Sequence, residues 1–362
     1  MNVLIVGAGI AGLSLAAALR DRGIESDVVE RLPEWPSAGA GLYLPANAWR
    51  ALEQLGVAAA LADHANPIER QRFLDHRGRV LAEIDLGAFW KGVGRCVAVR
   101  RPVLHDALAR ATSNVSVRLG VAMTGVETGP KSTVALSDGR SETYDLVVGA
   151  DGVHSAVRRL GLGGPVARYV GQSSWRFVAR GFPELRDWTV MLGRGRAFLT
   201  VVLGDGDVYC YADADQKRLA EFDGDWREMF SDFAEPVPHL LGHATDAYFA
   251  PIEEVAAPSW TAQGTVLLGD AAHATSPNMA QGAAMALEDA LVLAELLATH
   301  QPVERALTEY ERRRRPRVEW VQAQTHRRDR TRSLPPILRN LTLRLAGERI
   351  YRSNYEPLRE PA

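Results

Sequence analysis

Residues 2–12, with the sequence NVLIVGAGIAG, indicate the fold of the N-terminal part of this chain. An apolar run typical of a buried strand opens the stretch, and residues 13–21 have the character of a helix. Between them, Gly7, Gly9 and Gly12 form the pattern G-x-G-x-x-G. The first glycine of this pattern allows a tight turn, the second lets a pyrophosphate approach the backbone, and the third lets helix and strand pack closely. The stretch therefore predicts a strand, a phosphate-binding turn and a helix.

A second strand is predicted over residues 26–30, SDVVE, after a break at Gly23. Glu30 ends this strand 18 residues after Gly12, where an acid can bind the adenosine ribose hydroxyls. The N-terminus of the intervening helix offers free N–H groups and a positive dipole end to phosphate. Strand, glycines, helix, strand and acid together predict a Rossmann-type dinucleotide-binding unit. The alternative is a glycine-rich turn that binds no ligand.

Composition excludes several classes of protein. The chain has 362 residues, enough for two to three domains, with 42 basic and 44 acidic residues. A net charge of −2 argues against a general nucleic-acid binder. Two cysteines, Cys96 and Cys210, cannot form a disulfide framework and fit a reducing compartment. No apolar segment is long enough to span a bilayer and no metal-ligand spacing stands out, so we expect a soluble cytoplasmic protein without metal, nucleic-acid or membrane partners.

Two further segments place an aspartate directly after an apolar strand. Residues 145–152, DLVVGADG, precede a predicted helix, and residues 266–270, VLLGD, precede a proline-containing turn and a long helix. The carboxyl ends of parallel strands form the edge of a sheet at which ligands bind. Asp270 is suited to accept hydrogen bonds from a ribityl chain, which a flavin carries and nicotinamide does not. The second segment therefore favours FAD over NAD as the bound cofactor.

Together the motifs resemble the class A FAD-dependent aromatic hydroxylases, a monooxygenase family with the p-hydroxybenzoate hydroxylase fold. The residues that carry the resemblance are GAGIAG at 7–12, Glu30-Arg31, RPVL at 101–104 with Leu108, GADG at 149–152, and GDAAH at 269–273. Several motifs in the family's order are far more specific than any one alone. The chain resembles the salicylate-hydroxylase-like and zeaxanthin-epoxidase-like branches more than p-hydroxybenzoate hydroxylase itself.

The resemblance implies an α/β fold in which a Rossmann-type FAD-binding domain carries an inserted β-sheet substrate domain and C-terminal helices. The FAD-binding domain is expected over residues 1–70, 98–167 and 258–330. The β-rich substrate-binding domain is expected over residues 71–97 and 168–257, and a C-terminal helical tail over residues 331–362. One FAD would be bound non-covalently, to a protein that is a monomer or a homodimer.

Family positions also imply which residues surround FAD. Arg101 would contact the pyrophosphate or ribose, and the backbone near Met123 would contact the adenine. Asp151 would lie near the flavin phosphate and the incoming reductant, or it would cap the helix that follows it, or it would do both. The full set of predicted cofactor-binding residues is Gly7, Gly9, Ile10, Ala11, Gly12, Glu30, Arg31, Arg101, Met123, Asp151, Gly269, Asp270, Pro277, Gly282, Ala283 and Ala284.

The sequence departs from the family in the turn before its long helix near residue 281. The common pattern after Pro277 has a glycine and an asparagine where this chain has Ala280 and Ala284. Backbone N–H groups at the helix start can still face flavin N1 and O2, where they would stabilise the anion of reduced flavin. The missing asparagine side chain leaves its contact to another group.

The activity implied by the resemblance is hydroxylation of a small phenolic or carboxylated aromatic substrate. NAD(P)H would reduce FAD transiently, and O₂ would add to reduced FAD as a C4a-hydroperoxide that delivers one oxygen atom. An epoxidase or a polyketide-type tailoring oxygenase of the same fold is the alternative, as are an FAD-dependent reductase and a non-catalytic FAD-binding homologue.

Candidate substrate-side residues lie in the strand-rich part of the chain. Arg176 lies between two aromatic residues in the triplet WRF, so on a strand its side chain points away from theirs. If the aromatics face a neighbouring helix or domain, Arg176 faces the pocket and can bind a carboxylate or phenolate; otherwise it lies on the outer face. Tyr209 or Tyr211 could relay the phenol proton. The basic run at 312–315 is interpreted as a solvated helix face paired with nearby glutamates.

Overall fold

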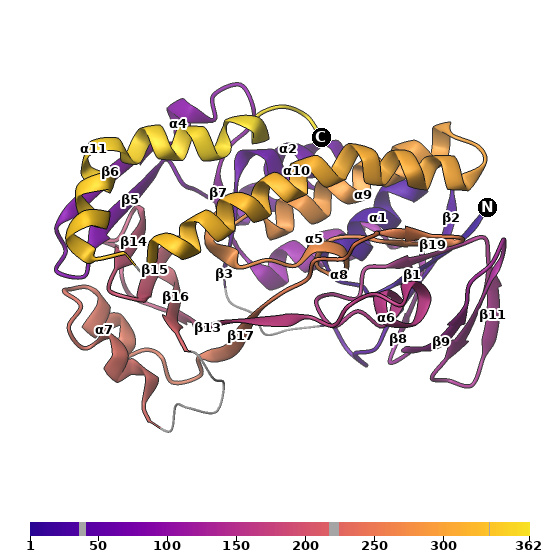
Figure 1. The fold of residues 1–362 in the computed structure, drawn as a ribbon, viewed down its shortest axis with the longest axis horizontal. Helices are drawn as coiled ribbons and strands as arrows, with labels where there is room; N and C mark the ends of the chain where they lie inside the picture. Colours follow the sequence, from indigo (N-terminus) through magenta and orange to yellow (C-terminus); the bar gives the residue numbers. More distant parts are fainter. Residues whose placement is uncertain (36–40, 217–223, 333) are drawn as a thin grey trace.

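Two large β-sheets form the framework of the protein in the computed structural model, which describes residues 1–35, 41–216, 224–332 and 334–362. Figure 1 shows these sheets on opposite sides of the molecule, with the long helices α9 (Gly282–Thr299) and α10 (Val303–Arg332) running along it above them. This arrangement sets the FAD motifs and the predicted substrate residues on different sheets.

The first sheet has six strands in the order β18-β19-β12-β1-β2-β8, and its neighbours are parallel except for β18 and β19. Its strands are β1 (Asn2–Val6), β2 (Glu25–Glu30), β8 (Ser116–Leu119), β12 (Leu146–Gly149), β18 (Thr261–Ala262) and β19 (Thr265–Leu267). Helix α1 (Ile10–Arg20) makes the predicted crossover from β1 to β2. A parallel sheet with such a crossover confirms the Rossmann-type α/β prediction.

A small antiparallel sheet follows β8 and consists of β9 (Met123–Glu127), β10 (Ser132–Leu136) and β11 (Ser141–Tyr144). The sequence SDG at 137–139 predicts a turn between strands at 133–136 and 146–148; the turn is present, but it joins β10 to β11 and not to β12. The sequence gives little sign of β11 because its first three residues are polar and only Tyr144 is buried.

The second large sheet has seven strands in the order β17-β13-β16-β15-β14-β5-β6. Its strands are β5 (Arg70–Asp75), β6 (Val80–Asp85), β13 (Arg168–Ala179), β14 (Trp188–Leu192), β15 (Arg196–Gly204), β16 (Asp207–Asp215) and β17 (Tyr248–Glu254). The alternating residues 72–84, with a turn at 76–78, predict a hairpin, which forms as β5 and β6. Parallel pairing of β14 with β5 attaches this hairpin to the later strands. A second small sheet lies against β15 and β16 and consists of β3 (Gly41–Leu44), β7 (Val97–Arg100) and β4 (Asn66–Pro67).

Helices cover the sheets and connect them. The remaining helices are α2 (Ala46–Gln54), α3 (Ala58–Leu61), α4 (Leu86–Phe89), α5 (Arg101–Ala111), α6 (Ala156–Leu162), α7 (Val237–Leu241), α8 (Asp270–His273) and α11 (Pro336–Tyr355), with short 3-10 helices η1 (Ala62–His64), η2 (Trp226–Phe230), η3 (Pro277–Met279) and η4 (Glu356–Leu358). The sequence of residues 220–233 predicts a helix, but over the described part, 224–233, only the 3-10 helix η2 forms; residues 220–223 lie outside the described residues.

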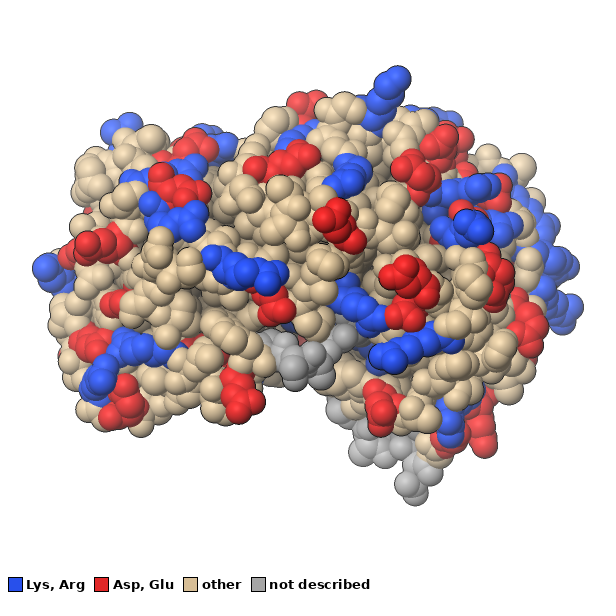
Figure 2. All heavy atoms as spheres, turned by 180° about the vertical axis from the view of Figure 1, so that it is seen from behind, with Lys and Arg blue, Asp and Glu red and all other residues tan. Residues whose placement is uncertain are grey.

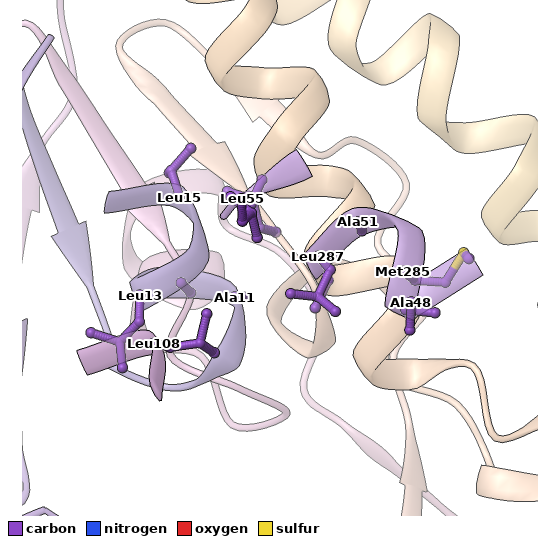
Figure 3. Close-up of a cluster of buried hydrophobic side chains, with 14 of the residues drawn as sticks. Ala11, Leu13, Leu15, Ala48, Ala51, Leu55, Leu108, Met285 and Leu287 are labelled. Carbon is purple, nitrogen blue, oxygen red and sulfur yellow. The ribbon is translucent and has the colours of Figure 1, made fainter. Parts of the chain in front are cut away.

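The main hydrophobic core packs α1 against α9 and α2 against α9. Figure 3 shows Leu13 of α1, Ala51 of α2 and Leu287 of α9 in one cluster, together with Leu108 of α5. Nine of the eleven residues of α1 are buried, and most of them are alanine or leucine. Small side chains allow close helix approach, so the starts of α1 and α9 are held side by side.

The surface carries both signs of charge. Figure 2 shows basic and acidic side chains interspersed over much of one face of the molecule, in line with the small net charge. In the ranges that the structure describes, every helix is too short or too polar to cross a bilayer.

Candidate active site

Motifs far apart in the sequence meet at one edge of the six-stranded sheet. A Cβ added to Gly7 would lie 2.4 Å from the carbonyl oxygen of Ala150, so the glycine turn touches the GADG segment. A Cβ added to Gly269 would lie 3.2 Å from the Cβ atoms of both Ala11 and Ala286. The glycine turn, the GADG segment, the GD segment and the start of α9 therefore form one continuous surface.

Two helix N-termini open onto this surface. Neither α1 nor α9 has a side-chain hydrogen bond at its N-cap residue, Gly9 or Gln281. A Cβ added to Gly9 or to Gly282 would have no described atom within 4 Å. Free N–H groups beside open space suit phosphate and other anionic groups. The residues present therefore fit FAD, and the placement of its pyrophosphate at α1 and of its flavin ring at α9 stays a prediction.

Glu30 joins the end of β2 to the glycine turn. Its carboxylate accepts hydrogen bonds from the N–H of Ala8 at 2.9 Å and the N–H of Leu32 at 3.0 Å. The carbonyl of Glu30 accepts a bond from the N–H of Val121, which brings the buried Met123 near the same strand end. Val121 thus joins the end of β2 to the segment that carries Met123, and the predicted contacts of Glu30 and Met123 with adenosine stay predictions. Arg31 follows Glu30 and is exposed.

Helix α5 lies against the glycine turn from another direction. His105 donates a hydrogen bond from Nε2 to the carbonyl of Ala8 at 2.9 Å. Arg101 lies one turn earlier, at the exposed start of the helix, with its charge close enough to act on Tyr209. The sequence predicts no role for His105. Its hydrogen-bond partner is a backbone carbonyl, which no residue pattern reveals.

Asp151 caps helix α6 and also lies beside Gly7. Its carboxylate accepts bonds from the N–H of Ala156 at 2.6 Å and from the hydroxyl of Ser155 at 2.5 Å. Burial raises the pKa of Asp151, and the bonds from Ser155, Val157 and Ala156 oppose that rise. The capping role is thus present, and the predicted cofactor role stays a prediction.

A buried network lies behind the exposed Asp270. Asp289 on α9 accepts bonds from the N–H of Gly269 at 2.9 Å, from His273 Nε2 at 2.7 Å and from Arg314 Nε at 2.7 Å. Burial alone would raise the pKa of Asp289, but the charges of His273 and Arg314 outweigh it and lower the pKa to about 2. This network fixes the GD segment to α9 and α10.

The same network reaches the start of α9. Arg314 donates to Glu288 at 2.9 Å, and Asn47 of α2 donates to both Glu288 and Gln281 at 3.0 Å. Arg314 is fully buried, so the interpretation of residues 312–315 as a solvated face is wrong for this residue. The interpretation holds for Arg312, which is exposed and pairs with Glu309 three residues earlier.

The predicted substrate-side residues share one face of the seven-stranded sheet. Arg176 pairs with Tyr211, and Tyr211 pairs with Leu199 on the next strand. The Arg176 guanidinium carbon lies 5.4 Å from the centre of the Tyr211 ring. A Cβ added to Gly41 of β3 would lie 2.5 Å from the Cβ of Tyr209. This face is therefore turned toward β3.

The opposite face of β13 holds the two aromatic residues that flank Arg176. Trp175 and Phe177 pack in a separate hydrophobic cluster with Phe198 of β15 and Phe230 of η2. The rings of Trp175 and Trp226 stack with their centroids 5.1 Å apart. The sequence leaves two arrangements open. In the structure, Trp175 and Phe177 face the cluster around η2, and Arg176 lies on the opposite face of the sheet, the inward face, with Tyr209 and Tyr211.

A profile of the family described as "FAD binding domain" matches residues 1–325 of the chain. The chain is 35% identical over 322 residues to the aurachin C monooxygenase/isomerase of Stigmatella aurantiaca, covering 86% of this chain and 84% of that protein. It is 32% identical over 333 residues to an FAD-dependent urate hydroxylase of Klebsiella pneumoniae, covering 88% and 87%.

The chain belongs to this family of FAD-dependent aromatic hydroxylases. Its fold agrees, because it superimposes on the crystal structure of Klebsiella pneumoniae HpxO complexed with FAD and uric acid with a TM-score of 0.90 and 27% identity, covering 100% of this chain and 97% of that one. The protein is thus an FAD-dependent monooxygenase, an oxidoreductase whose cofactor is FAD.

We expect Glu30→Ala and Asp270→Ala each to weaken FAD binding by this monooxygenase. Loss of a charge-assisted hydrogen bond, worth about 1.5–3 kcal/mol, lowers affinity roughly tenfold to a hundredfold. Titration of the apoprotein with FAD, followed by flavin fluorescence, measures the change. Asp63→Ala is a matched control, because Asp63 is exposed and lies outside the site. An unchanged dissociation constant in either site variant would contradict the assigned role of that residue.

Proposed function

We propose that the monooxygenase uses NAD(P)H and O₂ to hydroxylate a small aromatic substrate that carries a phenol or a carboxylate. The proposal rests on Arg176, which is half-buried on the inward face and has no hydrogen bond or ion pair within the described ranges. The Nε of this guanidinium is buried without a hydrogen-bond acceptor among the described residues, and an anionic partner satisfies a buried N–H most strongly. A carboxylate or phenolate of the substrate would supply that partner in a two-bonded geometry.

Similarity to HpxO supports this substrate class. The HpxO structure contains uric acid, an acidic heteroaromatic compound, and that protein matches this chain over its full length. The relative from Klebsiella pneumoniae is named a urate hydroxylase. The proposal for this chain extends only to the class of acidic aromatic compounds.

Two tyrosines provide neutral donors beside Arg176. Burial raises the pKa of Tyr209, with the charges of Arg176 and Arg101 opposing the rise, and burial raises the pKa of Tyr211 further. Both phenols are therefore protonated near neutral pH. The hydroxyl of Tyr211 is buried without a hydrogen-bond partner among the described residues. We infer that it donates to a substrate oxygen and holds it, a role that raised pKa values favour over proton relay.

The apolar neighbours of these groups keep the site dry. Leu199 and Val201 lie on the same face of the sheet, and Trp188 belongs to the same core as the FAD-binding elements. Bound FAD would carry electrons from NAD(P)H and deliver one oxygen atom of O₂ by the route that the family resemblance implies. Exclusion of water by the apolar side chains favours transfer of that oxygen to substrate over release as H₂O₂.

A panel of phenols and aromatic acids tests the proposal. We expect at least one acidic aromatic compound to stimulate NAD(P)H oxidation by the holoenzyme and to yield a product heavier by one oxygen atom. The matched control for each hit is its analogue without the acidic group, which should stimulate weakly. Stimulation by neutral hydrocarbons alone, or NAD(P)H oxidation without any oxygenated product, would contradict the proposal.

A further inference from the structure

The turn before α9 has a conformation that its sequence does not favour. Ala280 has φ 50° and ψ 36°, the left-handed region in which a Cβ is disfavoured. Among the described residues, Asp205 is the only other non-glycine residue with positive φ. The family's common pattern has glycine at position 280, which reaches this conformation freely. An unfavourable backbone conformation persists only where the surrounding structure fixes it.

Residues from the C-terminal end of the chain hold the two peptide groups before Ala280. Arg328 donates from Nη1 to the carbonyl of Asn278 at 2.6 Å, and Tyr355 donates its hydroxyl to the carbonyl of Met279 at 3.1 Å. The side chain of Asn278 in turn donates to Asp329. The carbonyl of Met279 and the N–H of Ala280 belong to the same planar peptide group. The hydrogen bond from Tyr355 therefore fixes the orientation of this peptide group, relative to which φ of Ala280 is defined.

The residues that hold the turn are themselves anchored. The Arg328 guanidinium lies 5.2 Å from the centre of the Tyr355 ring, and the Tyr351 and Tyr355 rings stack at 4.4 Å. Tyr351 accepts a hydrogen bond from the indole of Trp90 at 3.1 Å. Arg328 and Tyr355 lie beyond residue 325, where the match to the family profile ends. The contacts are made by the C-terminal helices α10 and α11.

We propose that Arg328 and Tyr355 are positioning residues that clamp the 277–281 turn and thereby set the backbone N–H groups at the start of α9 against the flavin ring. The inference rests on the proposed placement of FAD at α9. The buried bonds of Asn47 and Arg314 fix the body of α9. The turn itself depends on the clamp, because Ala280 favours another conformation.

Two matched tyrosine variants test the clamp. Tyr355→Phe removes only the hydroxyl that binds Met279, and Tyr351→Phe removes a hydroxyl four residues away that binds Trp90 and not the turn. We expect Tyr355→Phe to raise the FAD dissociation constant roughly three- to tenfold, the effect of one lost hydrogen bond, and to shift the flavin midpoint potential. Tyr351→Phe should lower the melting temperature but leave the FAD dissociation constant and the potential unchanged.

Glycine at position 280 provides a rescue test. Ala280→Gly removes the steric penalty of the left-handed conformation. In that background, Tyr355→Phe should change the FAD dissociation constant by less than about twofold. Equal effects of the two tyrosine variants on the potential, or no rescue by glycine, would overturn the clamp. If Asp270→Ala weakens FAD binding and Tyr355→Phe does not, the clamp alone fails; if Asp270→Ala has no effect, the placement of FAD fails.

Discussion

Arg314→Met is expected to destabilise the protein by about 3–5 kcal/mol, because it leaves buried carboxylates without their main cation. Arg314 lies at 0% exposure and bonds both Asp289 and Glu288. Methionine keeps most of the volume, so the loss reflects charge and hydrogen bonds more than a cavity. Unfolding by urea, followed by circular dichroism, measures the change in free energy of unfolding.

Arg312→Met is the matched control for Arg314→Met. Its side chain is 72% exposed and pairs with Glu309 on the same helix, so its replacement should leave the urea midpoint unchanged. The pH dependence of the free energy of unfolding provides a second measurement. The pKa of Asp289 is lowered from 3.8 to about 2, so its contribution to stability is present above pH 3.8 and disappears as the pH falls toward 2. Equal stability losses in both arginine variants would contradict the buried role.

Arg176→Ala is expected to separate NAD(P)H oxidation from hydroxylation. The variant should keep FAD and its basal NAD(P)H oxidation, because Arg176 lies on a strand of the seven-stranded sheet and is not one of the predicted FAD contacts. Loss of a charge-assisted contact to substrate should weaken substrate stimulation roughly tenfold to a hundredfold. A poorly bound substrate is seldom in position while the oxygenating state lasts. The electrons from NAD(P)H should then reduce O₂ to H₂O₂ without forming hydroxylated product.

Measurement of H₂O₂ formed per NAD(P)H consumed tests this expectation. Arg180→Ala is the control, because Arg180 is exposed just beyond the end of the same strand. It should retain wild-type coupling of NAD(P)H oxidation to product. Full coupling in Arg176→Ala would remove Arg176 from the substrate site and leave Tyr209 and Tyr211 as the candidates.

The FAD-binding half was predictable because its signals are local. Gly7, Gly9 and Gly12 lie within six residues, and strand periodicity places Asp270 at a strand end. The structure adds that these local motifs meet at Gly269 and Ala286, as a parallel sheet edge requires. The face on which Arg176 lies was not predictable, because it depends on η2 and its cluster on the other side of the sheet.

Arg314 was misinterpreted for a related reason. Its neighbours Arg312 and Arg315 do pair with Glu309 and Glu311 along the helix, and the sequence pattern is the same for all of them. Only Arg314 points at Asp289, and that partner lies on another helix. Long-range ion pairs leave no periodic signal. The clamp on the 277–281 turn escaped prediction likewise, because its partners are backbone carbonyls.

The central claim is that the enzyme transfers oxygen from O₂ to an acidic aromatic substrate. The most direct test is turnover of a stimulating substrate under ¹⁸O₂ with NAD(P)H, followed by mass spectrometry of the product. The account predicts that the oxygen atom added to the product carries the label. A product that contains only oxygen from water, or unlabelled substrate recovered after NAD(P)H is consumed for every acidic compound tested, would contradict it.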